Sequence, residues 1–192
     1  VKTPDWTEAV RMADRKMRRA VMKKLDQKGM PTWRFWSRLL CRTLPTHARM
    51  AKFAASSEDN AYKRVYGDHI GDEGVCVTCG EGAETVQHAV WDCPAARKGW
   101  SQLEAELIGD WEAKGLEWGE WDWLERERSP GWKVMWSLAG LVPVQTYDKI
   151  IADTTIDQRS AFTLVRDTAM KIVKQANTAW TARNERTLRW EE

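Results

Sequence analysis

The sequence predicts a mostly α fold, a helical bundle with an embedded knuckle of cysteine and histidine residues. Two observations favour helices: apolar residues recur every three or four positions near both ends of the chain, and glycine or proline separates the resulting stripes. A third observation predicts the knuckle, because three of the four cysteines and one of the three histidines fall within 18 residues.

Length and composition are those of soluble globular proteins. The 192 residues are enough for one domain with a core, or for a compact core with an appended small module, and 30% are charged and 43% apolar. No run approaches the roughly 18 apolar residues that a membrane span requires, and the first residues, VKTPDW, lack the apolar core of a signal peptide. Because the chain begins with Val, we expect a processed product or a piece of a longer protein.

The first helix is expected over residues 5–28. Its apolar stripe recurs at intervals of three or four and consists of Trp6, Val10, Ala13, Met17, Val21 and Leu25. Gly29 closes this helix, and Pro31 begins a second one. A third helix is expected over 46–55, after the turn at Leu44 and Pro45.

The first 66 residues are strongly basic. They carry a net charge of +10, residues 67–128 carry −10, and the remainder carries +2. The positive side chains of the first helix are Arg15, Lys16, Arg18, Arg19, Lys23 and Lys24, and those of the second are Arg34, Arg38 and Arg42. Such rows can neutralise the phosphates of RNA or DNA, with Trp33 available for base stacking, or they can be the solvated faces of amphipathic helices. Charge alone leaves both interpretations open for the first helix, whereas in the second we favour buried tryptophans and exposed arginines.

The centre of the chain carries four residues with the spacing of a metal site. Cys76 and Cys79 form CVTC, His88 follows after eight residues, and Cys93 after four more. Thiolate and neutral imidazole match the borderline softness of zinc, and four protein ligands leave no open position for a catalytic water. The spacing therefore predicts a structural Zn²⁺ ion in a CCHC zinc knuckle.

The residues around these ligands predict how the knuckle folds. Gly80 permits a turn whose backbone amides point back at the thiolates, and residues 84–91 have helical spacing that places His88 opposite the turn. Pro94 ends that helix and can open the next one, which runs to about Leu107. Three thiols committed to a metal indicate a reducing compartment, nuclear or cytoplasmic.

An acidic, tryptophan-rich segment follows the knuckle. Seven tryptophans lie between positions 100 and 136, and because each buries up to about 250 Å², this segment must pack on something. We favour an internal core between the knuckle and the C-terminal helices. The alternative is a surface for a protein partner with a basic face, formed by Trp111, Trp118, Trp121 and Trp123.

The C-terminal part predicts two more helices after a break at 140–143. A short helix is expected over 145–152, and a long one over about 156–188. The apolar stripe of the long helix is formed by Phe162, Val165, Ala169, Ile172, Val173, Ala176 and Trp180. We expect this helix to pack antiparallel to the first, which gives three parts: a basic helical segment (1–71), the CCHC module (72–109), and the acidic segment with the long helix (110–192).

The phrase CVTCGEGAETVQHAVWDCPAARKGW resembles the zinc-binding domain at the C-terminal end of reverse transcriptases of non-LTR (LINE-type) retrotransposons. That family shows two cysteines, an acidic ET before the histidine, an apolar pair, a cysteine and a later tryptophan. Looser similarities are Phe35-Trp36, the Leu44-Pro45-Thr46 turn, and WTARN from Trp180 to Asn184. The gap of eight before the histidine argues against a retroviral gag-like knuckle.

The resemblance implies a nucleic-acid-binding module that is not catalytic by itself, within a parent that is an RNA-directed DNA polymerase. The chain has no YxDD-type metal pair, Gly-rich phosphate loop, GxSxG or HExxH, and its Asp148, Asp153 and Asp157 lack the Pro-Asp context of the nuclease that some relatives carry. The alternative is an element-derived structural subunit of a larger ribonucleoprotein assembly. A metal-dependent nuclease is the third interpretation, which the missing carboxylate cluster disfavours.

Overall fold

The computed structural model describes residues 13–27, 30–40, 44–118 except 56–73, and 134–190. Within these ranges the chain is helical, with two isolated β-bridges and no strand, so the mostly α prediction is confirmed. The elements are α2 (Arg15–Gln27), α3 (Met30–Leu40), α4 (His47–Ala55), the π-helix η1 (His88–Asp92), α6 (Pro94–Glu112), α8 (Val134–Leu138), α9 (Val144–Asp153) and α10 (Gln158–Trp190).

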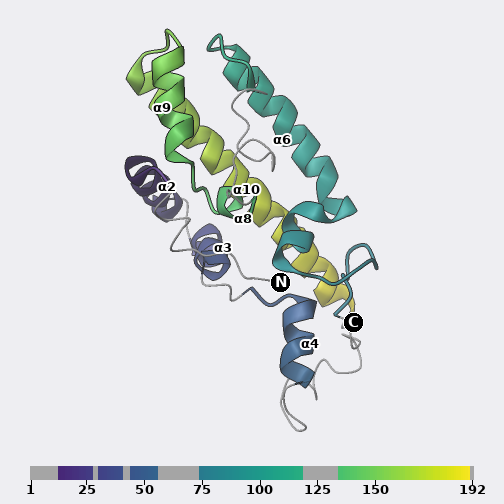
Figure 1. Cartoon of the computed structure of the whole chain (residues 1–192). Coiled ribbons are helices and arrows are strands. Elements are labelled where there is room, and N and C mark those ends of the chain that lie inside the picture. The colour runs from purple at the N-terminus through teal and green to yellow at the C-terminus, as the bar shows by residue number, and fades with distance from the viewer. Residues whose placement is uncertain (1–12, 28–29, 41–43, 56–73, 119–133, 191–192) are drawn as a thin grey trace.

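Helix α10 is the central helix of the bundle. It runs diagonally through Figure 1, with α6 along one side and α2, α3, α8 and α9 on the other, and it contacts each of them as well as η1. Its predicted stripe is buried except at its start, where Phe162 is half-buried: Val165, Ala169, Ile172, Val173 and Ala176 are fully covered and Trp180 is 5% exposed. The stripe therefore packs inside this chain, as we expected, because small residues allow neighbouring helices to approach closely.

Helix α2 begins later than the sequence predicts. Ala13 pairs with Pro143 in a β-bridge, and the amide of Asp14 donates to the Val142 carbonyl at 2.9 Å, so the chain is extended here. Asp14 then caps α2, since its Oδ1 accepts from the Met17 amide at 2.6 Å. The prediction of one helix passing through Ala13 is wrong, because the tertiary contact replaces helical hydrogen bonds. Trp6 and Val10 lie outside the described residues.

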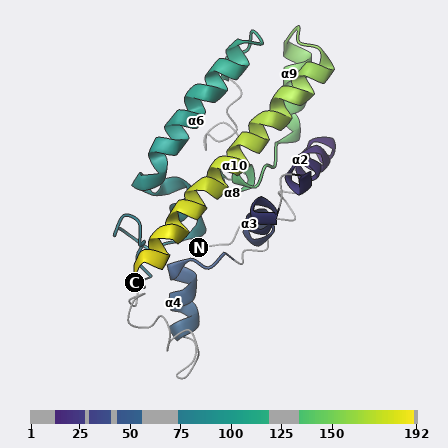
Figure 2. The same ribbon diagram turned by 180° about the vertical axis from the view of Figure 1, so that it is seen from behind.

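The buried face of α2 matches its predicted stripe. Met17, Val21 and Leu25 are at most 1% exposed and join the common core. In Figures 1 and 2 α2 is seen nearly end-on, whereas α10 runs across the picture. The two helices therefore cross, and the antiparallel arrangement that we predicted is wrong.

Helices α3 and α4 lead into the knuckle. In α3, Phe35, Trp36 and Leu39 are buried, and the Trp36 indole donates from Nε1 to the Ala139 carbonyl at 2.8 Å. This confirms Trp36 as a core residue, while the side chain of Trp33 lies outside the described residues. Helix α4 extends from the end of the bundle at which the C-terminus lies (Figure 2).

Helix α6 places the described tryptophans of the acidic segment in the core. Trp111 is fully buried, its Nε1 donates to Thr168 Oγ1 of α10 at 2.9 Å, and its ring meets Trp118 edge-on at 5.2 Å. Trp118 is itself only 4% exposed, which agrees with the internal core that we favoured. Trp121 and Trp123 lie outside the described residues. The predicted boundary at 109/110 falls inside α6, which runs from the knuckle to Glu112 without a break.

None of the helices in the described part of the chain combines the length and the apolar character that a membrane span requires.

Candidate metal centre

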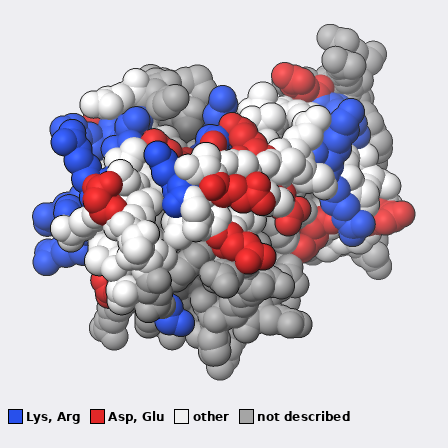
Figure 3. Space-filling view, turned by 90° about the horizontal axis from the view of Figure 1, so that it is seen from above, with Lys and Arg blue, Asp and Glu red and all other residues white. Residues whose placement is uncertain are grey.

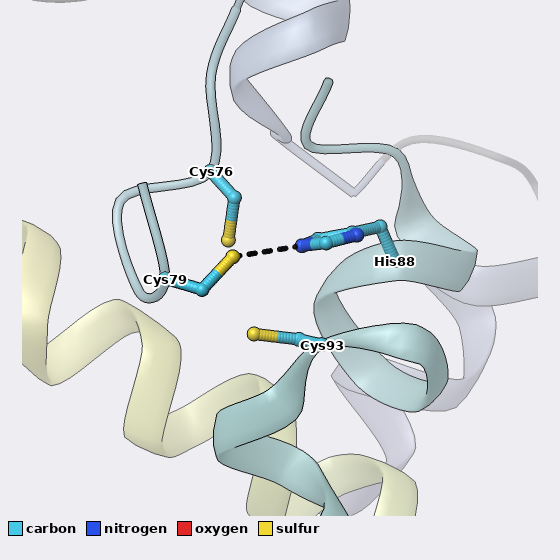
Figure 4. A group of neighbouring side chains, drawn as sticks. All are labelled: Cys76, Cys79, His88 and Cys93. Carbon is cyan, nitrogen blue, oxygen red and sulfur yellow. Dashed lines mark hydrogen bonds between the residues drawn. The ribbon is translucent and has the colours of Figure 1, made fainter. Parts of the chain in front are cut away.

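The four predicted ligands come together at one point. The sulfur atoms of Cys76, Cys79 and Cys93 and a ring nitrogen of His88 all lie within 4.8 Å of one another, and in Figure 4 they point toward a common centre. In a tetrahedral shell with zinc–sulfur bonds of about 2.3 Å, sulfur atoms lie roughly 3.8 Å apart, so a small contraction would close the site. Within the described residues this is the one group of three or more potential ligands close enough to hold a metal ion.

The two N-terminal cysteines sit in a tight loop. The Cys76 amide donates to the Gly82 carbonyl at 3.0 Å next to the bridge between Val75 and Ala83, and the Gly80 amide donates to the Cys76 carbonyl at 2.8 Å. Gly80 has φ +72°, a left-handed conformation that favours glycine. The amides of Thr78 and Glu81 donate to the sulfurs of Cys76 and Cys79, each at 3.4 Å. The predicted turn with amides aimed at the thiolates is confirmed.

The other two ligands are presented by a π-helix. The Cys93 amide donates to the His88 carbonyl at 2.8 Å, five residues back. This wider turn places His88 and Cys93 one above the other on the same side, whereas α-helical geometry would rotate them apart. The short helix predicted over 84–91 is present from Val86 to Asp92, and its His88–Asp92 part is a π-helix, which the spacing of residue types did not indicate. Thr85 begins the turn, since its Oγ1 accepts from the His88 amide at 3.0 Å.

Nε2 is the His88 atom that faces the cluster, at 3.3 Å from the Cys79 sulfur. Cys93 then caps α6, with Pro94 at the first helical position as predicted, so the fourth ligand is fixed by the start of a nineteen-residue helix. Helix α6 ends at Glu112, five residues beyond the predicted end. The ligand set is thus attached to a long and well-packed element.

Burial disfavours the thiolate forms of Cys76 and Cys93 when no cation is present. It raises the pKa of Cys76 to about 12 and also raises the pKa of Cys93. A divalent ion bound by the sulfurs favours the thiolate form, so metal binding releases protons. Three soft sulfur donors and one imidazole fit a closed tetrahedral shell, an arrangement that can stabilise the fold and leaves no position for a catalytic water.

A second layer of contacts surrounds the loop, and it was not predicted from the sequence. Glu84 is fully buried, and its carboxylate accepts from Arg183 of α10 and from the His47 amide at the start of α4. Arg186 donates to the carbonyl of Thr78, which lies between the two cysteines, at 3.1 Å. Both Glu84 and Arg183 stand in phrases singled out only for their resemblance to a family, ET and WTARN. Their separation of 99 positions hides the pairing from local patterns.

The predicted basic residues of α2 divide into two groups. Arg15, Lys16, Arg19 and Lys23 are exposed, and Arg18 and Lys24 are half-buried. Lys16 lies 4.9 Å from the centre of the Phe162 ring, and Lys24 is 4.0 Å from Asp167 of α10. These two lysines are therefore partly engaged within the chain, whereas Arg15, Arg19 and Lys23 form no ion pair or cation–π contact with the residues that the structure describes.

Helix α3 adds Arg34 and Arg38, both exposed, and it packs against α2. Arg42 lies outside the described residues. Seen from above, Lys and Arg gather at two opposite sides of the molecule with a band of Asp and Glu between them (Figure 3). One basic side is that of α2 and α9. Side chains of opposite charge thus occupy different parts of this face.

No protein-family model, curated protein or solved structure matches this chain.

Proposed function

We propose that this chain is a zinc-stabilised module that binds RNA or DNA, similar to the C-terminal region of a LINE-type retrotransposon reverse transcriptase and not catalytic by itself. The observation that carries the proposal is the convergence of four ligand atoms within 4.8 Å of one another. Three thiolates and one imidazole select zinc over hard cations such as Mg²⁺ and Ca²⁺. The thiol ligands suit a nuclear or cytoplasmic location, where they stay reduced.

The exposed row on α2 supports contact with a phosphate backbone. Arg15, Arg19 and Lys23 follow one another at four-residue intervals, so they line one side of the helix with a rise of about 6 Å per step. Arg34 and Arg38 repeat this spacing on the adjacent helix. Rows of cations bind nucleic acid by releasing condensed counterions, which gives affinity with little sequence preference. These two helices pack against α10, which also contacts α6 and the π-helix of the knuckle.

The decisive experiment measures binding of the zinc-loaded chain to labelled single- and double-stranded RNA and DNA over a range of salt concentrations. For the triple variant Arg15→Gln, Arg19→Gln, Lys23→Gln we expect an affinity loss of about 10- to 100-fold. Its salt slope on duplex DNA should fall by roughly 2 to 3, since each phosphate contact contributes about 0.9.

The matched control removes the same charge elsewhere. Lys98, Lys114 and Lys174 are exposed on α6, on the turn that follows α6 and on α10, and none of them belongs to the row on α2. Their triple glutamine variant should bind nearly as the unchanged chain does. Absence of salt-dependent binding to every probe by the zinc-loaded chain would refute the nucleic-acid part of the proposal.

The second candidate function is that of a structural subunit in a larger ribonucleoprotein assembly. It is favoured by the outer face of α6, where Ile108 is 38% exposed between Glu104 and Glu112, both exposed. An apolar residue framed by acids suits a protein neighbour with a basic surface. An obligate subunit of this kind should be insoluble or unfolded when purified alone, whereas a binding module should be a stable monomer.

A further inference from the structure

Two arginines near the end of α10 reach the loop that carries the cysteines. The guanidinium of Arg183 is 4% exposed and donates from Nε and Nη2 to Oε1 of Glu84, which is fully buried; the Nε distance is 3.1 Å. The guanidinium of Arg183 lies over the ring of Trp180, with its Cζ 5.0 Å from the ring centre. Almost no water reaches this ion pair, so its geometry is determined by the protein alone.

The Glu84 carboxylate links three segments of the chain. Besides Arg183, it accepts from the amide of His47 at 2.8 Å and from the amide of Val77 at 3.4 Å. Val77 directly follows the first metal ligand, Cys76. The carboxylate therefore connects the start of α4, the CVTC loop and α10. A displacement of any one of these segments would break a buried, charge-assisted hydrogen bond.

Arg186 reaches the same loop from the next turn of the helix. Its Nη1 donates to the Thr78 carbonyl at 3.1 Å, and residues three apart lie on the same side of an α-helix. Thr78 separates Cys76 from Cys79, so this contact holds the turn that brings the two sulfurs together. One face of α10 thus contacts the loop on both sides of the second cysteine.

We propose that Arg183 and Arg186 are positioning residues of the metal centre, so that metal binding and docking of the end of α10 form one cooperative unit. This inference rests on the metal site of the proposed function. Three thiolates around a divalent ion carry a net charge of −1, which the guanidinium of Arg186 favours; the charge of Arg183 is balanced by Glu84, so Arg183 acts by fixing the loop. The arginines also fix the loop before the ion arrives, and outer contacts of this kind are commonly as important to affinity as the ligands that they orient.

The test measures zinc affinity by competition with a chromophoric chelator. Arg186→Gln should weaken zinc binding about 3- to 10-fold, since its contact is exposed, and Arg183→Lys should weaken it about 10- to 100-fold, since lysine keeps the charge but loses the two-point contact. Lys174→Gln is the matched control, an exposed cation on the same helix, and should leave affinity unchanged. Because Arg186 is exposed, its variant should fold even if Arg183→Lys does not.

A second readout separates this role from simple packing. In the unchanged chain, zinc should slow amide hydrogen exchange at residues 180–187 of α10 by at least about 10-fold while leaving residues 161–173 unaffected. In Arg186→Gln the protection gained at 180–187 should be smaller. Unchanged zinc affinity in both arginine variants, or equal exchange at 180–187 with and without zinc, would overturn the inference. If the unchanged chain binds no zinc at all, the proposed function itself fails instead.

Discussion

The knuckle and the helical bundle are held together by different forces. Between positions 74 and 93 few apolar side chains are fully covered, and the loop is fixed by amide–sulfur contacts, glycine turns and the buried carboxylate of Glu84. The bundle instead buries whole tryptophans and a continuous stripe of α10. The bundle can therefore hold its shape by apolar burial, whereas the knuckle is the region that an ion bound at its centre would stabilise.

The largest expected effect is therefore loss of the metal. Cys93→Ala or His88→Ala should abolish zinc binding and unfold residues 74–93, because apparent zinc-binding free energies of about 10–16 kcal/mol act as folding free energy in such modules. Most of the helical circular dichroism from α2, α9 and α10 should remain. Amide hydrogen exchange resolved along the chain checks both expectations.

The fourth cysteine supplies the control for this experiment. Cys41 is not part of the CCHC pattern in the sequence, so Cys41→Ala should keep one zinc per chain. Complete loss of helicity in Cys93→Ala would contradict the separation of the two regions.

Loss of a buried aromatic ring from the bundle should lower the stability of the chain and leave its zinc affinity almost unchanged. Trp111→Ala removes a fully buried indole and its hydrogen bond to Thr168, which should lower the free energy of unfolding by about 3–5 kcal/mol. Zinc affinity of the folded fraction should change little, because Trp111 is in the last turn of α6, far along the helix from Cys93. Urea denaturation of the zinc-loaded chain measures the first effect and chelator competition the second.

The Glu84–Arg183 ion pair joins the knuckle to the bundle, so a change there should affect both the stability of the chain and its zinc affinity. Glu84→Gln leaves the buried Arg183 without a charged partner, and removing one member of a buried pair costs about 3–5 kcal/mol. Glutamine retains an oxygen that can accept from the His47 amide, so we expect the lower end of that range. Both the midpoint of urea unfolding and the zinc affinity should fall. A variant that changes the midpoint alone would show that Glu84 serves only the bundle.

The smallest effect is expected at the start of α2. Asp14→Ala removes the cap on the Met17 amide and should lower the free energy of unfolding by about 1 kcal/mol. Asp14→Asn should restore most of the loss, because asparagine also caps helices well. Neither variant should alter the zinc content, since α2 is remote in sequence from the ligands. Thermal unfolding of the three proteins compares these effects.

The sequence predicted the features of the knuckle and of the bundle that have local signals, and it missed those that depend on contacts between distant residues. Ligand spacing identified Cys76, Cys79, His88 and Cys93, and apolar periodicity identified α3, α4, α9 and α10, because these signals are local. The π-turn between His88 and Cys93 cannot be predicted from the residue types, because they do not distinguish it from an α-helical turn. The start of α2 was missed because the bridge of Ala13 to Pro143 joins residues far apart in the sequence. The Glu84–Arg183 pair was missed for the same reason.

The charge pattern of the sequence does not predict which basic residues contact other parts of the chain. The sequence could not separate Lys16 and Lys24, which contact Phe162 and Asp167, from Arg15 and Arg19 on the same helix. That distinction depends on which face of α2 meets α10. Nucleic-acid binding by the row stays a prediction that only a binding experiment can decide.

The most direct test of the central claim is a combined measurement of metal stoichiometry and coordination on the purified chain. Native mass spectrometry should find one zinc ion per chain, and zinc X-ray absorption should show about three sulfur neighbours near 2.3 Å and one nitrogen near 2.0 Å. A chain that carries no metal after purification with zinc present, yet protects the amides of residues 74–93 from exchange, would contradict the account.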